Sequence, residues 1–308
     1  MSTEMSLLAQ EGGRRCGHIA LIGAPNAGKS TILNRLVGHP LAIVTPKPQT
    51  TRSRLLGIVV VGASQLVFVD TPGIFAPRRR LDRAMVKAAW EGVKDADLTL
   101  FLADAARGID ADARRILDRL KERGRGRILV LNKIDLVRRE SLLPLADALF
   151  REAPFERSFM ISALTGDGVE DLRSYLAASV PEGPWLYPED QLSDTAERTL
   201  AAEITREQVF VQLREELPYA STVETESWEE RKDGSVRIAQ VIYVERPSQR
   251  AIVLGEGGQR LKAIGTRARA EMASRFGRRV HLFLFVKVRG RWAEDPERYR
   301  EMGLDYDV

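Results

Sequence analysis

Residues 23–30 read Gly-Ala-Pro-Asn-Ala-Gly-Lys-Ser, and this stretch matches the phosphate-binding pattern G-x-x-x-x-G-K-[S/T]. It follows the apolar run 18–22, which is typical of a buried strand, and precedes residues 31–36, whose apolar side chains are spaced for one face of a helix. A strand, a glycine-rich loop and a helix N-terminus are the context that this pattern requires. The stretch therefore predicts an α/β domain that binds the phosphates of a nucleotide.

The chemistry of this loop assigns a task to each polar group. Backbone N–H groups and the positive end of the helix hold phosphate oxygens, the ammonium of Lys29 neutralises the outer phosphates and so acts in catalysis, and the Ser30 hydroxyl is a ligand for Mg²⁺. The residues expected to contact the nucleotide here are Gly23, Pro25, Asn26, Ala27, Gly28, Lys29, Ser30 and Thr31.

The composition is that of a folded protein with room for two domains. Of the 308 residues, 29% are charged and 44% are hydrophobic. Cys16 is the only cysteine, which excludes an intrachain disulfide, and the sequence contains neither a secretory signal nor an apolar run of membrane-spanning length. A monomer in the cytoplasm is expected, and peripheral association with the inner membrane is left open.

The net charge of +4 conceals an uneven distribution of charge along the chain. Residues 246–300 hold fourteen Lys and Arg against five Asp and Glu, a net charge of +9. Residues 182–230 hold three Arg against thirteen Asp and Glu, a net charge of −10. The basic segment indicates a phosphate-rich partner, whereas the acidic stretch is typical of a solvated helix face and a linker.

Apolar runs and amphipathic stretches alternate as far as residue 180. The expected strands are residues 18–22, 54–61, 66–69, 98–102, 128–131 and 159–161, and the expected helices are residues 30–37, 81–93, 111–123, 141–151 and 169–178. This alternation predicts a doubly wound, mainly parallel sheet. Only Gly62 and Ala63 separate the second and third strands, so we expect these two strands to form an antiparallel hairpin at the sheet edge.

The proline-rich stretch 181–188 interrupts this alternation and marks a domain boundary. Beyond it we expect an α+β domain with a helix near 195–217, strands near 221–226 and 236–244, a helix–turn–helix element at 249–276 and a last strand at 280–288. The predicted organisation is an N-terminal tail (1–15), an α/β P-loop domain (16–181), a linker (182–194) and a second domain (195–308).

Two further segments complete the expected metal site. Residues 70–73 read Asp-Thr-Pro-Gly, in which the Asp70 carboxylate can hold a Mg²⁺-bound water and the Gly73 N–H can approach the γ-phosphate. The loop 41–54 contains the adjacent threonines Thr50 and Thr51, and a threonine there can complete the coordination of Mg²⁺. We favour Thr51 over Thr50. The expected metal ligands are Ser30, Thr51 and Asp70, and the expected catalytic residues are Lys29, Asn26, Thr51 and Gly73.

Residues 132–135 read Asn-Lys-Ile-Asp and follow an expected strand, which is the pattern of a base-selecting loop. The Asp135 carboxylate can accept both N1–H and the exocyclic amine of guanine, a donor pair that adenine does not offer. Asn132 can contact the base edge and brace the phosphate loop, and the Lys133 stem can pack along the base. Further along the chain, the N–H of Ala163 can serve guanine O6. These expected contacts are Asn132, Lys133, Asp135, Ser162, Ala163 and Leu164.

The second domain contains Gly255-Glu256-Gly257-Gly258 between two expected helices. Such a Gly-x-x-Gly loop lets a nucleic-acid backbone approach closely, and the order of helices and strands around it resembles a KH domain with the helix-first topology. The expected RNA contacts are Gly255, Gly257, Gly258, Lys262 and Arg267. Glu256 departs from the usual pattern, because an acidic residue in this loop repels phosphate.

The basic residues of this domain are candidates for RNA contacts, and its apolar residues are candidates for the core. About half of the basic residues Lys262, Arg267, Arg269, Arg275, Arg278 and Arg279 are expected to contact RNA. The residues expected in the core are Ile252, Val253, Leu261 and Ile264. His281, Phe283 and Phe285 alternate on the last strand, and we favour a core position for them over a stacking surface.

Taken together, the motifs resemble the translation-factor class of GTPases, in the branch that contains the Era family. The residues that carry the resemblance are Pro25-Asn26 in the phosphate loop, Thr50-Thr51-Arg52, the Asp-Thr-Pro-Gly and Asn-Lys-Ile-Asp segments, and Ser162-Ala163. It implies an α/β P-loop GTPase domain, doubly wound with one antiparallel edge strand, followed by an α+β KH domain. It also implies GTP/GDP and Mg²⁺ as cofactors, with K⁺ bound through Asn26 in place of an arginine finger.

The resemblance extends from Gly17 to about Gly303 and implies a partner. That partner is RNA, specifically the 3′ end of small-subunit rRNA in the assembling 30S subunit. Ile74 stands where a water-orienting glutamine occurs in other GTPases, so we expect slow intrinsic hydrolysis. Two alternatives remain: a GTPase that acts on another RNA such as tRNA, and an RNA-binding protein with a non-hydrolysing nucleotide site. An ATP-dependent kinase is disfavoured by the Asn-Lys-Ile-Asp segment.

Overall fold

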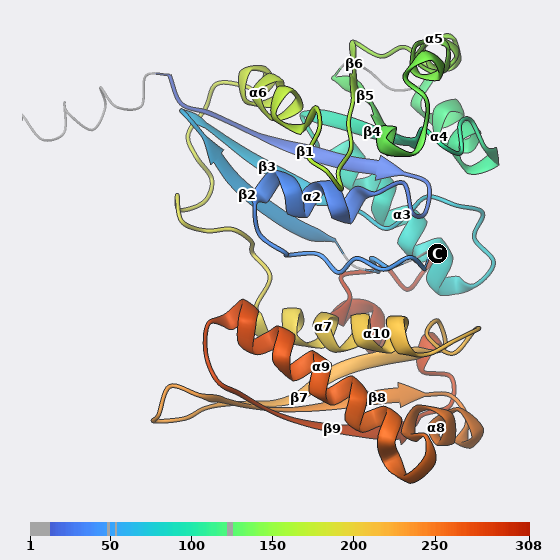
Figure 1. Cartoon of the computed structure of the whole chain (residues 1–308), viewed down its shortest axis with the longest axis vertical. Helices are drawn as coiled ribbons and strands as arrows, with labels where there is room; N and C mark the ends of the chain where they lie inside the picture. Colours follow the sequence, from blue (N-terminus) through green and yellow to red (C-terminus); the bar gives the residue numbers. More distant parts are fainter. Residues whose placement is uncertain (1–12, 48–49, 53, 122–125) are drawn as a thin grey trace, which may run out of the picture. The chain divides into compact units, whose positions relative to one another are not determined.

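The computed structural model describes residues 13–47, 50–52, 54–121 and 126–308, and most of the predicted N-terminal tail lies outside them. The chain forms two compact units. The first comprises residues 1–42, 51–194 and 302–308, and the second comprises residues 43–50 and 195–301. Figure 1 shows the first unit mainly in blue to yellow-green and the second in yellow to red.

The first unit is built on a six-stranded sheet in the order β2-β3-β1-β4-β5-β6. Its strands are β1 (Arg15–Gly23), β2 (Leu55–Val61), β3 (Ser64–Asp70), β4 (Leu98–Asp104), β5 (Arg127–Asn132) and β6 (Arg157–Met160). All pairings are parallel except that of β2 with β3, which is antiparallel and lies at the edge of the sheet. The predicted doubly wound fold and its edge hairpin are confirmed. β1 begins at Arg15, the last residue of the predicted tail.

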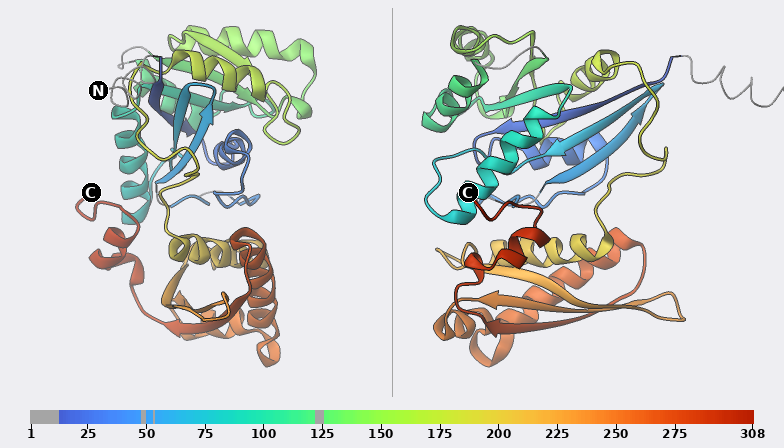
Figure 2. Two further views of the ribbon diagram at one scale, coloured as in Figure 1. Left: turned by 90° about the vertical axis from the view of Figure 1, so that its left-hand side faces the viewer. Right: turned by 180° about the vertical axis from the view of Figure 1, so that it is seen from behind.

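Helices cover both faces of this sheet (Figures 1 and 2). They are α2 (Lys29–Val37), α3 (Arg80–Lys94), α4 (Ala111–Lys121), α5 (Leu142–Glu152) and α6 (Val169–Ser179), with 3-10 turns at Ile134–Leu136 and Arg139–Ser141. Successive β1 side chains point to opposite faces: Ile19 and Leu21 pack with α2 and α6, whereas Ala20 and Ile22 pack with α3, α4 and α5. The second half of β1 is therefore buried on both sides, which explains its apolar run at residues 19–22.

The predicted linker 182–194 is an ordered strap along β2 and β3 of the first unit. Ser193 donates to Leu56 O at 2.7 Å, and Trp185 and Tyr187 pack against the core beneath it. Gln65 is fully buried, and its side chain donates to Tyr187 O at 2.8 Å and accepts from the N–H of the same residue at 3.0 Å. The proline-rich composition indicated irregular backbone, but it gave no sign of these bonds.

The second unit packs helices against a three-stranded sheet in the order β7-β8-β9. Its elements are α7 (Glu197–Gln212), β7 (Ser221–Glu230), β8 (Val236–Val244), α8 (Pro247–Leu254), α9 (Gln259–Phe276), β9 (Val280–Val288) and α10 (Pro296–Glu301), with 3-10 turns at Glu256–Gly258 and Trp292–Glu294. The strand pair β8–β9 is parallel and β7–β8 antiparallel. This is the predicted α+β domain, to which the structure adds α10.

The core of the second unit corrects two predictions. Val253 and Ile264 are fully buried, and Leu261 packs against them, as expected. Ile252 is 49% exposed, and on β9 Phe283 and Phe285 are 43% and 51% exposed. Alternate β9 residues point away from the helices, and a residue on that face remains accessible because helices cover the other face.

Candidate nucleotide site and nucleic-acid interface

The phosphate loop joins the end of β1 to the start of α2 and is held in a shape that requires glycine. A Cβ on Gly28 would lie 2.2 Å from Asn132 Nδ2, and one on Gly23 would lie 2.6 Å from Leu102 O. Gly28 also has a φ of 99°, and Asn26 takes the left-handed conformation with a φ of 64°. The spacing of the two glycines therefore reflects close approaches to two strands, β4 at Leu102 and β5 at Asn132.

Lys29 is the first residue of α2, and its side chain folds back over the loop. Its Nζ donates to Gly23 O at 3.1 Å and to Ala24 O at 3.2 Å. Burial lowers the pKa of Lys29 to about 8, and the neighbouring Asp70 opposes this shift only in part. The Lys29 ammonium thus lies against the phosphate loop, whose backbone N–H groups are expected to bind the phosphate oxygens.

Ser30, Thr51 and Asp70 meet at one point. Ser30 Oγ donates to Asp70 Oδ2 at 2.9 Å and lies 3.0 Å from Thr51 Oγ1, which donates to the same carboxylate oxygen at 3.3 Å. Thr50 points elsewhere, because its hydroxyl donates to Lys47 O at 3.0 Å. Of the two threonines, the structure brings Thr51 to this cluster.

The donor set of this cluster fits Mg²⁺, which prefers oxygen ligands. Asp70 is fully buried, and its Oδ1 atom has no hydrogen-bond partner among the described residues. Burial raises the pKa of Asp70, while Lys29 and the Ser30 and Thr51 hydroxyls act in the opposite direction. A divalent cation beside this carboxylate would satisfy the orphaned oxygen and favour its charged form.

The loop after Asp70 lies against the phosphate loop. Gly73 is buried, and a Cβ there would lie 3.1 Å from Pro25 Cα. The next residue, Ile74, donates its N–H to Gly23 O at 3.1 Å, and its side chain is buried in the core with α3 and α4. An apolar side chain that is buried in the core cannot orient a water molecule by hydrogen bonding, and slow hydrolysis stays a prediction.

The expected base-selecting residues lie on two neighbouring loops. Asn132 donates through Nδ2 to Ala27 O at 2.9 Å and accepts from the Ala163 N–H at 2.9 Å. That N–H, which we expected to serve guanine O6, has therefore found an acceptor within the protein. Lys133 pairs with Asp104 at 2.6 Å, and Asp135 is exposed in the short 3-10 turn that follows.

A side chain of α2 also binds the loop 162–164. Ser162 is fully buried and its Oγ accepts from Thr165 N at 3.1 Å, whereas Leu164 is 71% exposed. The guanidinium of Arg35 donates to Ala163 O at 3.2 Å and to Leu164 O. Arg35 could not be identified from sequence, because one basic residue on a helix surface forms no pattern.

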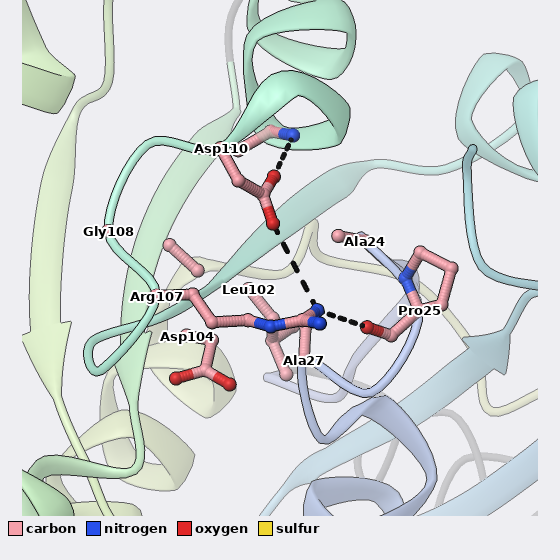
Figure 3. Close-up of a pocket in the computed structure, with 10 residues that line it drawn as sticks. Ala24, Pro25, Ala27, Leu102, Asp104, Arg107, Gly108 and Asp110 are labelled. Atoms are coloured by element: carbon pink, nitrogen blue, oxygen red, sulfur yellow. Dashed lines mark hydrogen bonds and ion pairs between the residues drawn. The ribbon is translucent and has the colours of Figure 1, made fainter. Parts of the chain in front are cut away.

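A second residue missed from sequence reaches the phosphate loop from the β4–α4 connection. Arg107 donates to Pro25 O at 3.3 Å and lies 3.9 Å from the carboxylate of Asp110 (Figure 3). The two side chains line a small pocket beside the loop, together with Asp104 and Gly108. No sequence signal distinguishes Arg107 from the other exposed arginines.

The expected nucleic-acid loop lies between α8 and α9. Gly255, Gly257 and Gly258 have φ values of 70°, 55° and 77°, which favour glycine. A Cβ on Gly257 or Gly258 would meet no atom of the described residues within 4 Å, so the loop has an open surface. Glu256 is exposed on the same loop. A backbone of another molecule can therefore approach closely at the two later glycines.

The basic residues around this loop divide into two groups. Arg275 pairs with Glu271 at 2.7 Å, and Arg278 pairs with Glu230 at 3.2 Å and with Glu197. These two guanidinium groups are partly engaged within the unit. The exposed members of the set are Lys262, Arg267, Arg269 and Arg279.

Comparison with known proteins assigns the chain to a family. A family model described as a 50S ribosome-binding GTPase matches residues 18–133, and one described as a KH domain matches residues 216–293. GTPase Era of Rhizobium meliloti (strain 1021) is 63% identical over 292 residues, which cover 95% of this chain and 93% of that protein. GTPase Era of Brucella suis biovar 1 (strain 1330) is 61% identical over 292 residues, with 95% and 94% covered. The chain belongs to the Era family of GTPases.

Solved structures of Era extend this likeness to the fold. A crystal structure of Era in complex with MgGDPNP and nucleotides 1506–1542 of 16S ribosomal RNA matches with a TM-score of 0.90 and 37% identity, covering 96% of this chain and 100% of that one. An Aquifex aeolicus Era variant bound to GDP·AlF4⁻ matches with a TM-score of 0.89, 37% identity and the same coverage. The predicted Era resemblance, the GTPase activity and the P-loop and KH folds are confirmed.

The described residues also bear on two other kinds of site. Within the described ranges, no group of three or more His, Cys, Asp or Glu side chains could hold a metal ion. The cluster at Asp70 instead combines one carboxylate with two hydroxyls, as expected for a cation shared with phosphate oxygens. No helix in the described part of the chain is long and apolar enough to cross a membrane.

The lowered pKa of Lys29 predicts a pH dependence of nucleotide binding. Phosphate raises the pKa of a neighbouring ammonium, so GTP binding must take up a proton once the pH exceeds about 8. We expect the affinity for a fluorescent GTP analogue to fall about eightfold between pH 7.5 and pH 9.0. Lys29→Arg should bind with little pH dependence over this range, because a guanidinium stays protonated. Equal slopes for the two proteins would contradict the assignment.

The position of Asp135 predicts a change in base preference. Asp135→Asn should weaken GTP binding at least a hundredfold, since two charge-assisted hydrogen bonds are worth about 3 kcal/mol or more. The variant should gain affinity for xanthosine triphosphate, whose C2 oxygen can accept from the new amide. Titrations with both nucleotides measure the two effects. Asp118→Asn, on the exposed face of α4, is the matched control and should bind GTP normally.

Proposed function

We propose that the protein is a GTP-hydrolysing switch that binds the 3′ end of small-subunit rRNA through its KH domain during assembly of the 30S subunit. The observation that carries this proposal is the match along 96% of the chain to Era in complex with nucleotides 1506–1542 of 16S ribosomal RNA. A monomer in the cytoplasm is part of the proposal. The proposal also includes the division of the chain into a GTPase domain (16–181), a linker (182–194) and a KH domain (195–308).

In the proposed nucleotide site, the residues of the chain bind and orient the triphosphate. The phosphate-loop N–H groups and Lys29 hold its oxygens, and the Gly73 N–H approaches the γ-phosphate. Ser30, Thr51 and Asp70 hold Mg²⁺, which supplies charge neutralisation of the phosphates when bound. The hydrogen bonds among these three side chains support this role, since they already share one oxygen-rich point.

The proposed rate and cation dependence follow from two side chains. Ile74 is buried in the core, so no side chain at that position orients the attacking water. We propose that Asn26 contributes to a K⁺ site that stabilises transition-state charge in place of an arginine finger. Support for this comes from the left-handed Asn26 backbone, which turns the chain between Pro25 and Ala27 at the phosphate loop. Intrinsic turnover is then slow in the absence of K⁺.

The proposed guanine contacts are Asn132, Lys133, Asp135, Ser162, Ala163 and Leu164. Asn132 supports them indirectly, because its amide joins the phosphate loop to the loop that follows β6. The exposed Asp135 carboxylate is available to a ligand and selects guanine.

The proposed RNA contacts are Gly255, Gly257, Gly258, Lys262 and Arg267. We also propose that GTP binding orders the Thr51 loop and the Asp70–Gly73 loop, and that this ordering changes how the KH domain binds RNA.

The function is tested by measuring GTP hydrolysis with and without RNA. We expect an oligonucleotide with the sequence of the 16S rRNA 3′ end to stimulate turnover severalfold in K⁺ buffer, because RNA binding is coupled to the nucleotide state. A scrambled oligonucleotide and tRNA should have no effect. The same assay in Na⁺ buffer should be slower if Asn26 supports a K⁺ site, and equal rates would remove that part of the proposal. Stimulation by tRNA alone would favour the tRNA-directed alternative.

The glycine loop is tested by a charge placed on its open surface. Gly258→Asp should reduce rRNA binding at least tenfold, because a carboxylate would repel the incoming phosphate backbone. GTP affinity should not change. Gly234→Asp is the matched control, since Gly234 also has a positive φ of 78° and open space around it, but lies in the β7–β8 turn. Electrophoretic mobility shifts measure RNA binding, and equal affinities for the two variants would exclude this loop as the contact.

A further inference from the structure

Asp104 is the last residue of β4 and lies opposite Asn132, where the neighbouring strand β5 ends. The Asp104 side chain reaches the loop that follows β5, and its Oδ2 atom accepts from Lys133 Nζ at 2.6 Å. The side chains of Asp104 and Lys133 are 9% and 30% exposed. A charged hydrogen bond that is largely shielded from water is stronger than a pair at the surface. Asp104 therefore holds the tip of the lysine side chain.

The turn that follows β4, seen in Figure 3, fixes the direction of this carboxylate. The second carboxylate oxygen, Oδ1, accepts from the N–H of Ala106 at 3.0 Å. The carbonyl oxygen of Asp104 accepts from the N–H groups of Arg107 and Gly108, at 3.1 Å and 3.0 Å. The turn thus holds Asp104 through both its backbone and its side chain, so the position of the carboxylate does not depend on Lys133 alone.

The backbone of Lys133 is fixed as well. It has a left-handed φ of 65°, a conformation that few residues with a side chain adopt. Its carbonyl accepts from Leu136 N–H at 3.0 Å, and the next residue, Ile134, donates its N–H to Ile161 O at 3.2 Å. The aliphatic stem of the lysine therefore runs between two fixed ends, the backbone just after β5 and the Asp104 carboxylate. A lysine without such an anchor samples many rotamers, and it loses this freedom when a ligand packs on it.

We propose that Asp104 is a positioning residue for guanine nucleotides, acting through Lys133 to hold its aliphatic stem where it can pack along the base. The proposal rests on the role of Lys133 in the proposed function. Ordering the stem beforehand lowers the entropy that is lost when the nucleotide binds. The benefit falls at the base, which GTP and GDP share, and not at the γ-phosphate or Mg²⁺.

The test removes the charge of Asp104 and keeps its shape. Asp104→Asn retains an oxygen for the Ala106 N–H but turns an amide N–H₂ group toward the Lys133 ammonium, which cannot accept a hydrogen bond. Asp112→Asn is the matched control, because Asp112 is also partly buried and pairs with a cation, Arg115, at 2.9 Å. With the full chain, the readouts are the Kd and dissociation rate of fluorescent GTP and GDP analogues, kcat and KM for GTP, and the half-saturating Mg²⁺ concentration.

We expect Asp104→Asn to weaken the binding of GTP and GDP equally, about threefold to tenfold, mainly through faster dissociation. KM should rise with Kd, while kcat and the Mg²⁺ requirement stay within about twofold of the unchanged protein. Asp112→Asn should change none of these quantities by more than about twofold. Asp104→Glu should recover part of the loss, since it restores a carboxylate. Nucleotide affinities of Asp104→Asn that equal those of Asp112→Asn would overturn the proposal, and so would a lower kcat with unchanged GDP binding.

Lys133→Met and the double variant separate this inference from the proposed function. If Asp104 acts through Lys133, adding Asp104→Asn to Lys133→Met should weaken GTP binding no further, whereas multiplied effects would overturn the inference. A Lys133→Met variant that binds GTP normally would overturn the proposed role of Lys133. Weak binding by Lys133→Met with normal binding by Asp104→Asn would overturn the inference alone.

A folding defect in Asp104→Asn, detected by thermal unfolding, would leave Lys133→Arg and Lys133→Met as the deciding pair. Both variants keep an apolar stem, but only the guanidinium of the first can pair with Asp104. We expect Lys133→Arg to bind GTP at least about threefold more tightly than Lys133→Met. Equal affinities of the two folded variants would overturn Asp104 as the anchor of the stem.

Discussion

The nucleotide site depends on the side-chain amide of Asn132. One end of this amide donates to Ala27 O in the phosphate loop, and the other accepts from Ala163 N–H in the loop after β6. Its nitrogen approaches so closely that only glycine fits at position 28. These loops come from distant parts of the chain, so one buried residue sets the spacing between the phosphate loop and the proposed base-binding loop. A shorter side chain there would leave a buried carbonyl and a buried N–H without partners.

The same site carries two buried charges whose environment favours their neutral forms. Burial lowers the pKa of Lys29 and raises that of Asp70, although each attracts the other. The two charged forms need partners of opposite charge. Phosphate would stabilise the charged form of Lys29, and a cation would stabilise the charged form of Asp70. A nucleotide that arrives with its metal supplies both. Because the nucleotide and the metal each stabilise one of these two charged groups, the site favours the metal–nucleotide complex over either component alone.

Sequence predicted what depends on periodicity and on fixed spacing, and it failed where a single polar contact decides. The strands and helices of the first unit follow from apolar runs, and the close approaches at Gly23 and Gly28 explain the glycine pattern. Arg35 and Gln65 hold loops through hydrogen bonds to backbone carbonyls, and the sequence around these residues does not predict such hydrogen bonds. Phe283 was misplaced because alternation along a strand separates two faces without showing which one the helices cover.

Net charge overstates the number of basic groups in the C-terminal segment that are free to meet RNA phosphates. Arg275 and Arg278 contribute to the +9 charge of the C-terminal segment, yet each is already paired with glutamates of its own unit. A paired guanidinium releases few counterions on binding nucleic acid, because its charge is partly neutralised beforehand. In the proposed interface, affinity then comes mainly from exposed residues such as Lys262, together with the open glycine backbone. Glu256 on that backbone would oppose phosphate, so a close fit at the glycines would have to outweigh a local repulsion.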